Sequence, residues 1–209
     1  GGCLLLGGRL GDLYGHRRLF LAGIALFTVA SLGCGLARSQ TMLVAARAVQ
    51  GVGGAVVSAV ALSLIMTLFT GAAERARAMG GYGFVGAGGG SVGVLLGGVL
   101  TSLLSWHWIF LVNLPLGVAI YLACRALLPE SAAPAVRQRL DIAGAVTITA
   151  ALMLAVYAIV GGNEVGWLTP QSLGLLGLSA ALLVAFVWIE SHVAAPLVPL
   201  GLLRQRNLS

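Results

Sequence analysis

The chain has 209 residues and a mean hydropathy of +1.01, and 59% of its residues are hydrophobic but only 9% are charged. Because a soluble domain carries about 25% charged residues, this composition excludes a soluble enzyme, a disordered tail and a disulfide scaffold. A helix that spans a bilayer needs about 20 apolar residues, so the length allows roughly six or seven spans. The formal charge of +6 leaves nucleic-acid binding as an alternative, which the positions of the basic residues can test.

Six complete apolar segments predict six transmembrane helices, and so an all-α polytopic membrane protein. They cover about residues 19–36, 43–69, 79–100, 108–128, 142–160 and 173–189. Residues 1–7 have the character of the end of another apolar helix, and no initiator Met precedes them, so we expect a fragment of a longer protein. Cys3, Cys34 and Cys124 lie in apolar stretches without metal-ligand spacing, and we expect them to be core residues rather than ligands.

The arginines predict the orientation in the membrane. All 12 basic residues are Arg, and if the six segments alternate across the bilayer, ten of them lie on one side. These ten are Arg9, Arg17, Arg18, Arg75, Arg77, Arg125, Arg137, Arg139, Arg204 and Arg206. The positive-inside rule makes this side cytoplasmic. Since the alternation accounts for the basic excess, we expect no nucleic-acid partner.

The segment 8–18, GRLGDLYGHRR, precedes the first complete helix. Its glycines predict a tight turn, and Asp12 can cap a helix or pair with an arginine; a solvated turn is the alternative. The segment resembles the loop between helices two and three of the major facilitator superfamily, G-x-L-x-D-x-x-G-R-K, although Leu13 and His16 depart from the usual arginines. The resemblance implies a cytoplasmic gate. Its residues would be Gly8, Asp12, Gly15, Arg17 and Arg18.

Arg47 lies about one turn inside the apolar segment 43–69. A charge at this depth costs at least about 2.5 kcal/mol on insertion scales, so it needs a partner or a water-filled cavity; snorkelling to the outer interface is the alternative. Helical spacing predicts that Gln50, Gly51, Gly54 and Ser58 share its face. The string RAVQGVGGA resembles the superfamily motif R-x-x-Q-G-x-G of helix four. The motif matches Arg47, Gln50, Gly51 and Gly53, and the resemblance implies proton coupling. With Ser58 from the same face and Asn113 from a later span, the candidates for the pathway are Arg47, Gln50, Gly51, Ser58 and Asn113.

The segment 79–100 is rich in glycine, and small residues let another helix approach closely. Residues 89–98 resemble the antiporter motif of helix five, G-x-x-x-G-P-x-x-G-G, with Val94 in place of the proline. Plain close packing is the alternative. The candidate packing residues are Gly86, Gly89, Gly90, Gly93, Gly97 and Gly98.

Two later segments resemble the fourteen-helix drug:proton antiporter family of the EmrB/QacA type. WHWIFLVNLPLG, residues 106–117, includes Asn113, which inside a span must find a hydrogen-bond partner on another helix or in a cavity. LDIAG, residues 140–144, contains Asp141 and Gly144 and resembles the start of an extra helix pair in that family.

The resemblance implies four parts. Residues 1–128 would be most of the N-terminal six-helix half, from the end of helix two through helix six. Residues 129–141 would be a cytoplasmic linker and residues 142–190 the inserted pair. Residues 191–209 would be a cytoplasmic segment leading to the C-terminal half.

The function implied is export of amphipathic drugs or other small organic compounds by proton antiport and alternating access, in the plasma membrane. We expect no enzyme activity, no metal and no cofactor. The resemblance implies that the proton gradient supplies the energy, and the chain has no P-loop motif that would energise a pump directly. No carboxylate lies deep in a predicted helix, so the titrating acid is expected outside this sequence. A major facilitator importer or exporter of one metabolite, and a non-transporting scaffold or receptor-like protein, remain alternatives. An accessory export protein is left open as a further partner.

Overall fold

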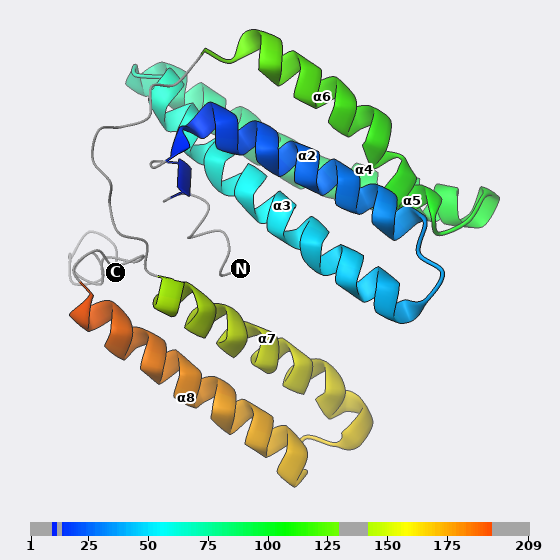
Figure 1. The fold of residues 1–209 in the computed structure, drawn as a ribbon, viewed down its shortest axis with the longest axis vertical. Coiled ribbons are helices and arrows are strands. Elements are labelled where there is room, and N and C mark those ends of the chain that lie inside the picture. The colour runs from blue at the N-terminus through cyan, green and yellow to red at the C-terminus, as the bar shows by residue number, and fades with distance from the viewer. Residues whose placement is uncertain (1–9, 12–13, 130–141, 194–209) are drawn as a thin grey trace. The chain divides into compact units, whose positions relative to one another are not determined.

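A computed structural model of the protein describes residues 10–11, 14–129 and 142–193. Apart from connecting turns, the described residues are helical (Figure 1). The chain divides into two compact units, residues 14–134 and residues 135–209 with 1–13. In the described parts, the first unit holds helices α2 to α6 and the second holds α7 and α8.

The first unit is built around α2 (His16–Gly35), which contacts α3 (Gln40–Leu68), α5 (Trp108–Leu111) and α6 (Asn113–Leu127). Figure 1 shows α2 between α3 and α6. A short turn joins α2 to α3, and the Ser39 hydroxyl oxygen caps α3 by accepting the Met42 N–H at 3.2 Å. α4 (Ala72–Leu103) follows and contacts only α3 and α5 to an appreciable extent within the described residues.

Three glycines allow the helices of this unit to approach closely. A Cβ placed on Gly53 of α3 would lie 2.7 Å from the Phe27 backbone nitrogen of α2. On the other helix, a Cβ on Gly23 would lie 3.0 Å from methyl carbons of Val56 and Val57. Gly117 of α6 has the same role against Thr28, where a Cβ would overlap the threonine hydroxyl. Glycine at these positions therefore brings α3 and α6 against α2.

The second unit is a helical hairpin of α7 (Ile142–Val165) and α8 (Pro170–His192). Thr169 caps α8 by accepting the Ser172 N–H, and Pro170 stands at its first turn, where its missing N–H costs nothing. The hydroxyl of Ser179 donates to the Ala151 carbonyl of α7 at 2.8 Å, and both residues are buried. This bond fixes the register of the pair.

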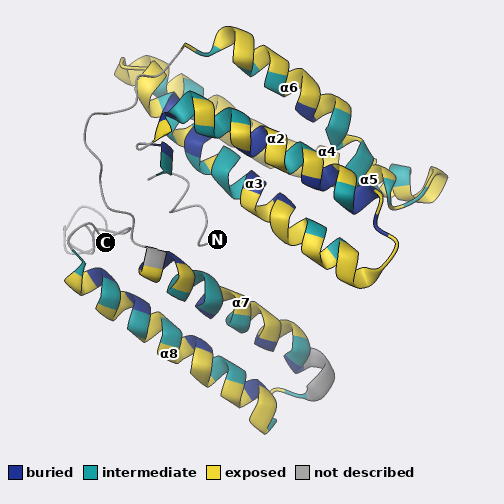
Figure 2. Ribbon diagram, viewed as in Figure 1, coloured by how far each residue is buried: buried dark blue, intermediate teal, exposed yellow. Residues whose placement is uncertain are grey.

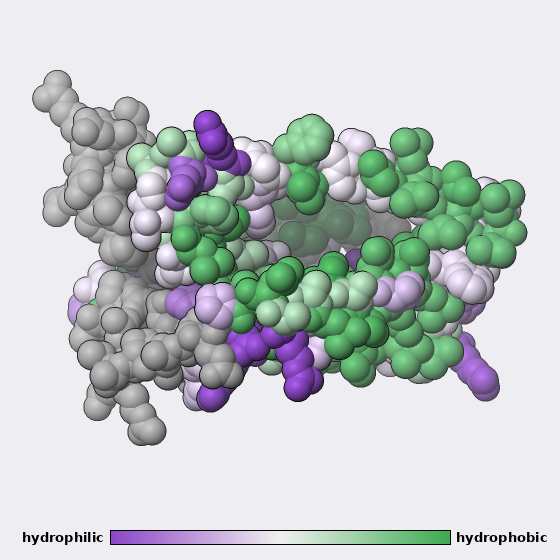
Figure 3. Space-filling model, turned by 90° about the horizontal axis from the view of Figure 1, so that it is seen from above, coloured by the Kyte–Doolittle hydropathy of each residue, from purple (hydrophilic) through white to green (hydrophobic). Residues whose placement is uncertain are grey.

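Six described helical segments are long and apolar enough to cross a membrane, when α5 and α6 are taken together as Trp108–Leu127. Large hydrophobic side chains are exposed along them. Figure 2 marks much of each helix as exposed, and Figure 3 shows hydrophobic residues over much of one face. α4 has no buried residue at all. A bilayer or other protein helices are the surroundings that such surfaces require. The predicted all-α membrane fold is confirmed.

The helix ends differ from the predicted segments in informative ways. α4 begins at Ala72, seven residues before the predicted 79, and α7 extends to Val165, five beyond the predicted 160. Hydropathy marks only the apolar stretch, whereas the backbone hydrogen bonds of a helix continue into polar turns. The first turn of α4, which carries Glu74, is an example. The predicted single helix 108–128 is interrupted at Val112, which separates α5 from α6.

Candidate functional site

Arg47 of α3 belongs to a polar cluster of the first unit; its own side chain is exposed, and its partners lie deeper in the unit. Its guanidinium Nη1 donates to Gln50 Oε1 at 2.8 Å, and its Cζ lies 5.5 Å from the centroid of the Phe110 ring of α5. The Gln50 amide Nε2 donates to Ser31 Oγ of α2 at 2.6 Å. Cys34 Sγ lies 3.8 Å from Gln50 Oε1. We name these five residues, which come from three helices, the Arg47 cluster.

The cluster explains how an arginine is tolerated within an apolar helix. Arg47 bonds to a residue one turn deeper in α3, so its guanidinium is not directed only toward the near end of the helix, as snorkelling would require. Gln50 is 2% exposed, and Ser31 and Cys34 are fully buried. A charge-assisted hydrogen bond and a cation–π contact both offset the cost of placing the charge there.

The residues predicted to share the Arg47 face are divided between two sides of α3. Gln50 points toward α2, and a Cβ on Gly54 would lie 3.6 Å from the Phe27 ring. Gly51 and Ser58 are exposed, and a Cβ on Gly51 would have no neighbour within 4 Å. One edge of this face, with Gln50, therefore packs against α2, and the other edge, with Gly51 and Ser58, is exposed.

Ser31, Cys34 and Phe110 were not among the predicted site residues. Ser31 and Cys34 are small polar residues in an otherwise apolar helix, which is a weak signal because such residues are common in membrane helices. Their meaning depends on the register of α2 against α3, which Gly23 and Gly53 set through backbone contact. Phe110 belongs to the string WHWIFLVNLPLG, residues 106–117, but nothing in its spacing indicates contact with Arg47.

Asn113 was expected to face another helix or a cavity, and this stays a prediction. Its side-chain Nδ2 donates to the Ile109 carbonyl at 3.4 Å, one turn earlier in the chain. The break at Val112 disturbs the helical ladder at this point. The amide therefore has a local partner, and among the described residues no hydrogen bond joins it to Arg47 or Gln50.

The predicted gate residues are only partly within the described residues. Gly8 and Asp12 lie outside them, so the pairing of Asp12 with an arginine stays a prediction. Gly15 stands just before α2 with φ 86°, a left-handed conformation that favours glycine. Arg17 Nη2 donates to the Arg125 carbonyl at 2.7 Å, and Arg18 is exposed. Arg17 thus ties the start of α2 to the last turns of α6.

A second arginine of the basic side also binds the carboxyl end of a helix. Arg75 Nε donates to the Phe69 carbonyl at 3.1 Å, and its Nη2 lies 3.5 Å from the Met66 carbonyl at the end of α3. Carbonyls at this end lack partners in the helix and carry partial negative charge. The Arg17 bond and the Arg75 bond each place the start of one span beside the end of another span. This agrees with the alternation across the membrane that was used to assign the basic side.

The six candidate packing glycines all lie on α4. A Cβ placed on any of them would meet no described neighbour within 4 Å. None of the described helices therefore uses the close approach that these glycines permit, and their predicted role in packing stays a prediction.

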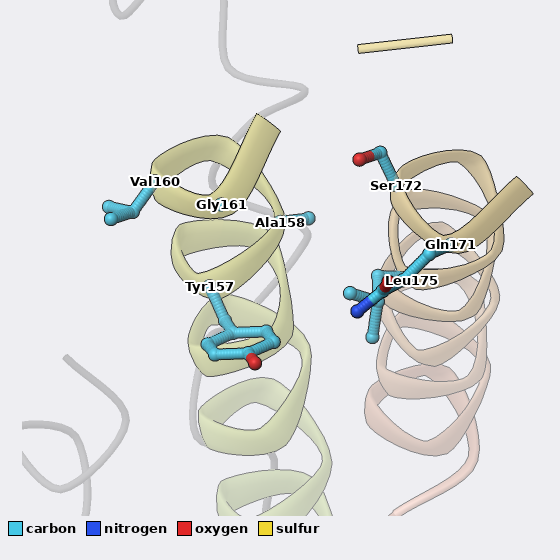
Figure 4. A pocket seen from close by; sticks show the side chains of 7 residues that line it. All are labelled: Tyr157, Ala158, Val160, Gly161, Gln171, Ser172 and Leu175. Carbon is cyan, nitrogen blue, oxygen red and sulfur yellow. The ribbon is translucent and has the colours of Figure 1, made fainter. Parts of the chain in front are cut away.

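The second unit contains the remaining predicted residues, and a small pocket lies between its two helices. Asp141 lies outside the described residues, and Gly144 is buried near the start of α7. A pocket of about 190 Å³ lies where α7 and α8 approach their connecting turn, with Tyr157, Gln171 and Ser172 among its lining residues (Figure 4).

Glu190 lies at the end of α8, as expected for the acids, but is only 3% exposed. Among the described residues, no group of three or more His, Cys, Asp or Glu could hold a metal ion.

The membrane-length apolar helices, one of which carries a paired arginine, define a polytopic helical membrane protein. The profile of the Major Facilitator Superfamily matches residues 2–200, and the chain belongs to this family. The membership of this superfamily that the sequence motifs implied is confirmed. Because this is a family of transporters, the expectation that the chain is not an enzyme is confirmed as well.

Several curated proteins are similar over nearly the whole chain. A puromycin resistance protein of Streptomyces alboniger is 44% identical over 99% of this chain and 41% of its own length. An uncharacterized MFS-type transporter of Mycobacterium tuberculosis is 43% identical over 99% of this chain and 38% of its own length. A cephamycin export protein of Amycolatopsis lactamdurans is 44% identical over 95% and 41%. The chain thus spans about two fifths of the length of these relatives.

Proposed function

We propose that this chain is part of a secondary active transporter that exports small amphipathic organic compounds in exchange for protons. The observation that carries the proposal is the Arg47 cluster, a paired cation within an apolar helix of a Major Facilitator Superfamily chain. Export is favoured over import because two of the similar proteins are named for resistance to, or export of, an antibiotic. A scaffold has no need for so costly a residue in a span.

Arg47 cannot itself carry the proton, because a guanidinium does not release its proton in proteins. Its role would be to attract and tune a carboxylate supplied by a part of the transporter outside this chain. A nearby cation favours the ionised form of a carboxylate, and substrate entry could then change how strongly the two groups interact. Gly51 and Ser58, on the open edge of α3, would line the same pathway.

The other predicted residues would serve the change between inward-open and outward-open states. Arg17, bonded to the end of α6, would hold the cytoplasmic gate together with Asp12 and Arg18. The exposed glycine stripe of α4 would accept a helix from the rest of the transporter. Alternating access would follow from rocking of the two halves around a midplane site. The arginine-rich side would face the cytoplasm in the plasma membrane, and no cofactor would be required.

The test is retention of a fluorescent lipophilic cation by cells that express the full-length transporter. We expect less dye in these cells than in cells with empty vector, and the difference should vanish when a protonophore collapses the gradient. Arg47→Ala should abolish the difference. Arg38→Ala, which removes an exposed arginine outside the cluster, is the matched control and should keep it. Equal retention with and without the gradient would refute proton-driven export.

A further inference from the structure

The buried hydrogen bond between α2 and α3 points to a positioning residue that no motif marks. We propose that Ser31 fixes the orientation of the Gln50 amide, so that the amide oxygen holds the Arg47 guanidinium beside the Phe110 ring. The inference rests on the proposed function, because it concerns the same arginine. It adds a residue from α2 to a site that the sequence pattern assigns to α3 alone.

The donors and acceptors determine which way the amide can point. Ser31 donates its own hydroxyl proton to the Phe27 carbonyl at 2.8 Å, so its oxygen is left to act as an acceptor. Gln50 Nε2 supplies the N–H at 2.6 Å, which turns Oε1 toward Arg47. If the amide were reversed, its NH₂ would face the donors of the guanidinium and its oxygen would face an oxygen with no free proton. Both contacts would then be repulsive.

Burial makes this orientation costly to lose. Ser31 is fully buried and Gln50 is 2% exposed, so water has little access to replace either partner. Without Ser31, the amide N–H would be left unsatisfied or would turn away, and the oxygen would turn with it. The guanidinium would then lose the contact that holds it on one side, and of its described contacts it would keep the Phe110 ring at 5.5 Å.

Ser63 supplies a matched control outside the Arg47 cluster. It lies on α3, and its hydroxyl donates to the Ala59 carbonyl of the same helix at 3.3 Å. Ser63→Ala therefore removes a serine hydroxyl and one hydrogen bond from the same pair of helices, but it leaves the partners of the Gln50 amide in place.

The first experiment measures gradient-driven export by the full-length transporter in proteoliposomes, at equal amounts of folded protein. Ser31→Ala and Gln50→Met should each lower the maximal rate about fivefold and change KM less than about twofold, as expected for loss of one hydrogen bond that acts in transport rather than in binding. The double variant should be no slower than either single variant. Ser31→Thr, which keeps the hydroxyl, should restore the rate, and Ser63→Ala should match the wild type.

The second experiment does not depend on transport. Phenylglyoxal modification of Arg47 in the purified protein, followed by mass spectrometry, should be about fivefold faster in Ser31→Ala and unchanged in Ser63→Ala, as expected for release of one hydrogen bond. Equal rates in Ser31→Ala and wild type, or additive losses in the double variant, would overturn the positioning role. A wild-type protein without gradient-driven export would instead overturn the proposed function, and the modification rates would still decide the role of Ser31.

Discussion

Replacement of Gly53 with Ala should weaken the packing of α3 against α2. The added Cβ would lie 2.7 Å from the Phe27 nitrogen, 3.0 Å from the Phe27 Cα and 3.1 Å from the Gly23 oxygen. All three are backbone atoms, so the clash cannot be relieved by a change of side-chain rotamer, and the helices must separate. Such overpacking typically costs about 1–3 kcal/mol.

Alanine is also a better helix former than glycine by about 1 kcal/mol, which partly hides this cost. Gly51→Ala is the matched control, because it gains the same propensity on the same helix and its Cβ would meet nothing within 4 Å. The comparison of the two variants therefore isolates the clash. We expect Gly53→Ala to be less stable than Gly51→Ala by about 1–3 kcal/mol.

The assay is thermal unfolding of the purified full-length protein in detergent, followed as loss of the monodisperse fraction. Gly53→Ala should have the lower Tm of the two variants. It should also lower export by disturbing the Arg47 cluster, which depends on the same pair of helices. Identical Tm values for Gly53→Ala and Gly51→Ala would refute the close approach of α2 and α3.

Three further outcomes are expected. Ser179→Ala removes the hydrogen bond to the Ala151 carbonyl and should weaken the α7–α8 hairpin by about 0.6–1.7 kcal/mol, measured as a lower Tm. Arg75→Gln should destabilise the end of α3 by about 0.3–1 kcal/mol, whereas Arg77→Gln should have no effect; equal Tm changes would contradict the cap. In a background without native cysteines, Arg38→Cys should react with an impermeant maleimide in intact cells, and Arg77→Cys only after permeabilisation; the opposite pattern would reverse the topology.

The fold could be predicted because lipid leaves few solutions. Backbone groups must be bonded within each span, so long apolar segments are read directly as helices. What hydropathy could not show is where a helix continues beyond the apolar stretch, as at Ala72, or where it is interrupted, as at Val112. These features depend on local backbone bonds that leave no trace in the average hydropathy of a segment.

The site could be predicted only on the helix that carries the motif. Arg47 is conspicuous because a charge in a span is expensive, and Gln50 follows it at helical spacing. Ser31 and Phe110 could not be predicted, because their contacts depend on the rotation of α2 and α5 relative to α3. The position of Gln50 on the α2 side, away from Gly51, follows from the same rotation.

The central claim is that this chain belongs to a transporter that couples substrate export to proton entry through Arg47. The most direct measurement uses the full-length protein in proteoliposomes that carry a trapped pH indicator. On addition of substrate to the side from which it is exported, we predict a proton flux in the opposite direction that is absent in Arg47→Ala and retained in Arg38→Ala. Substrate movement without any proton flux in the wild type would contradict the claim.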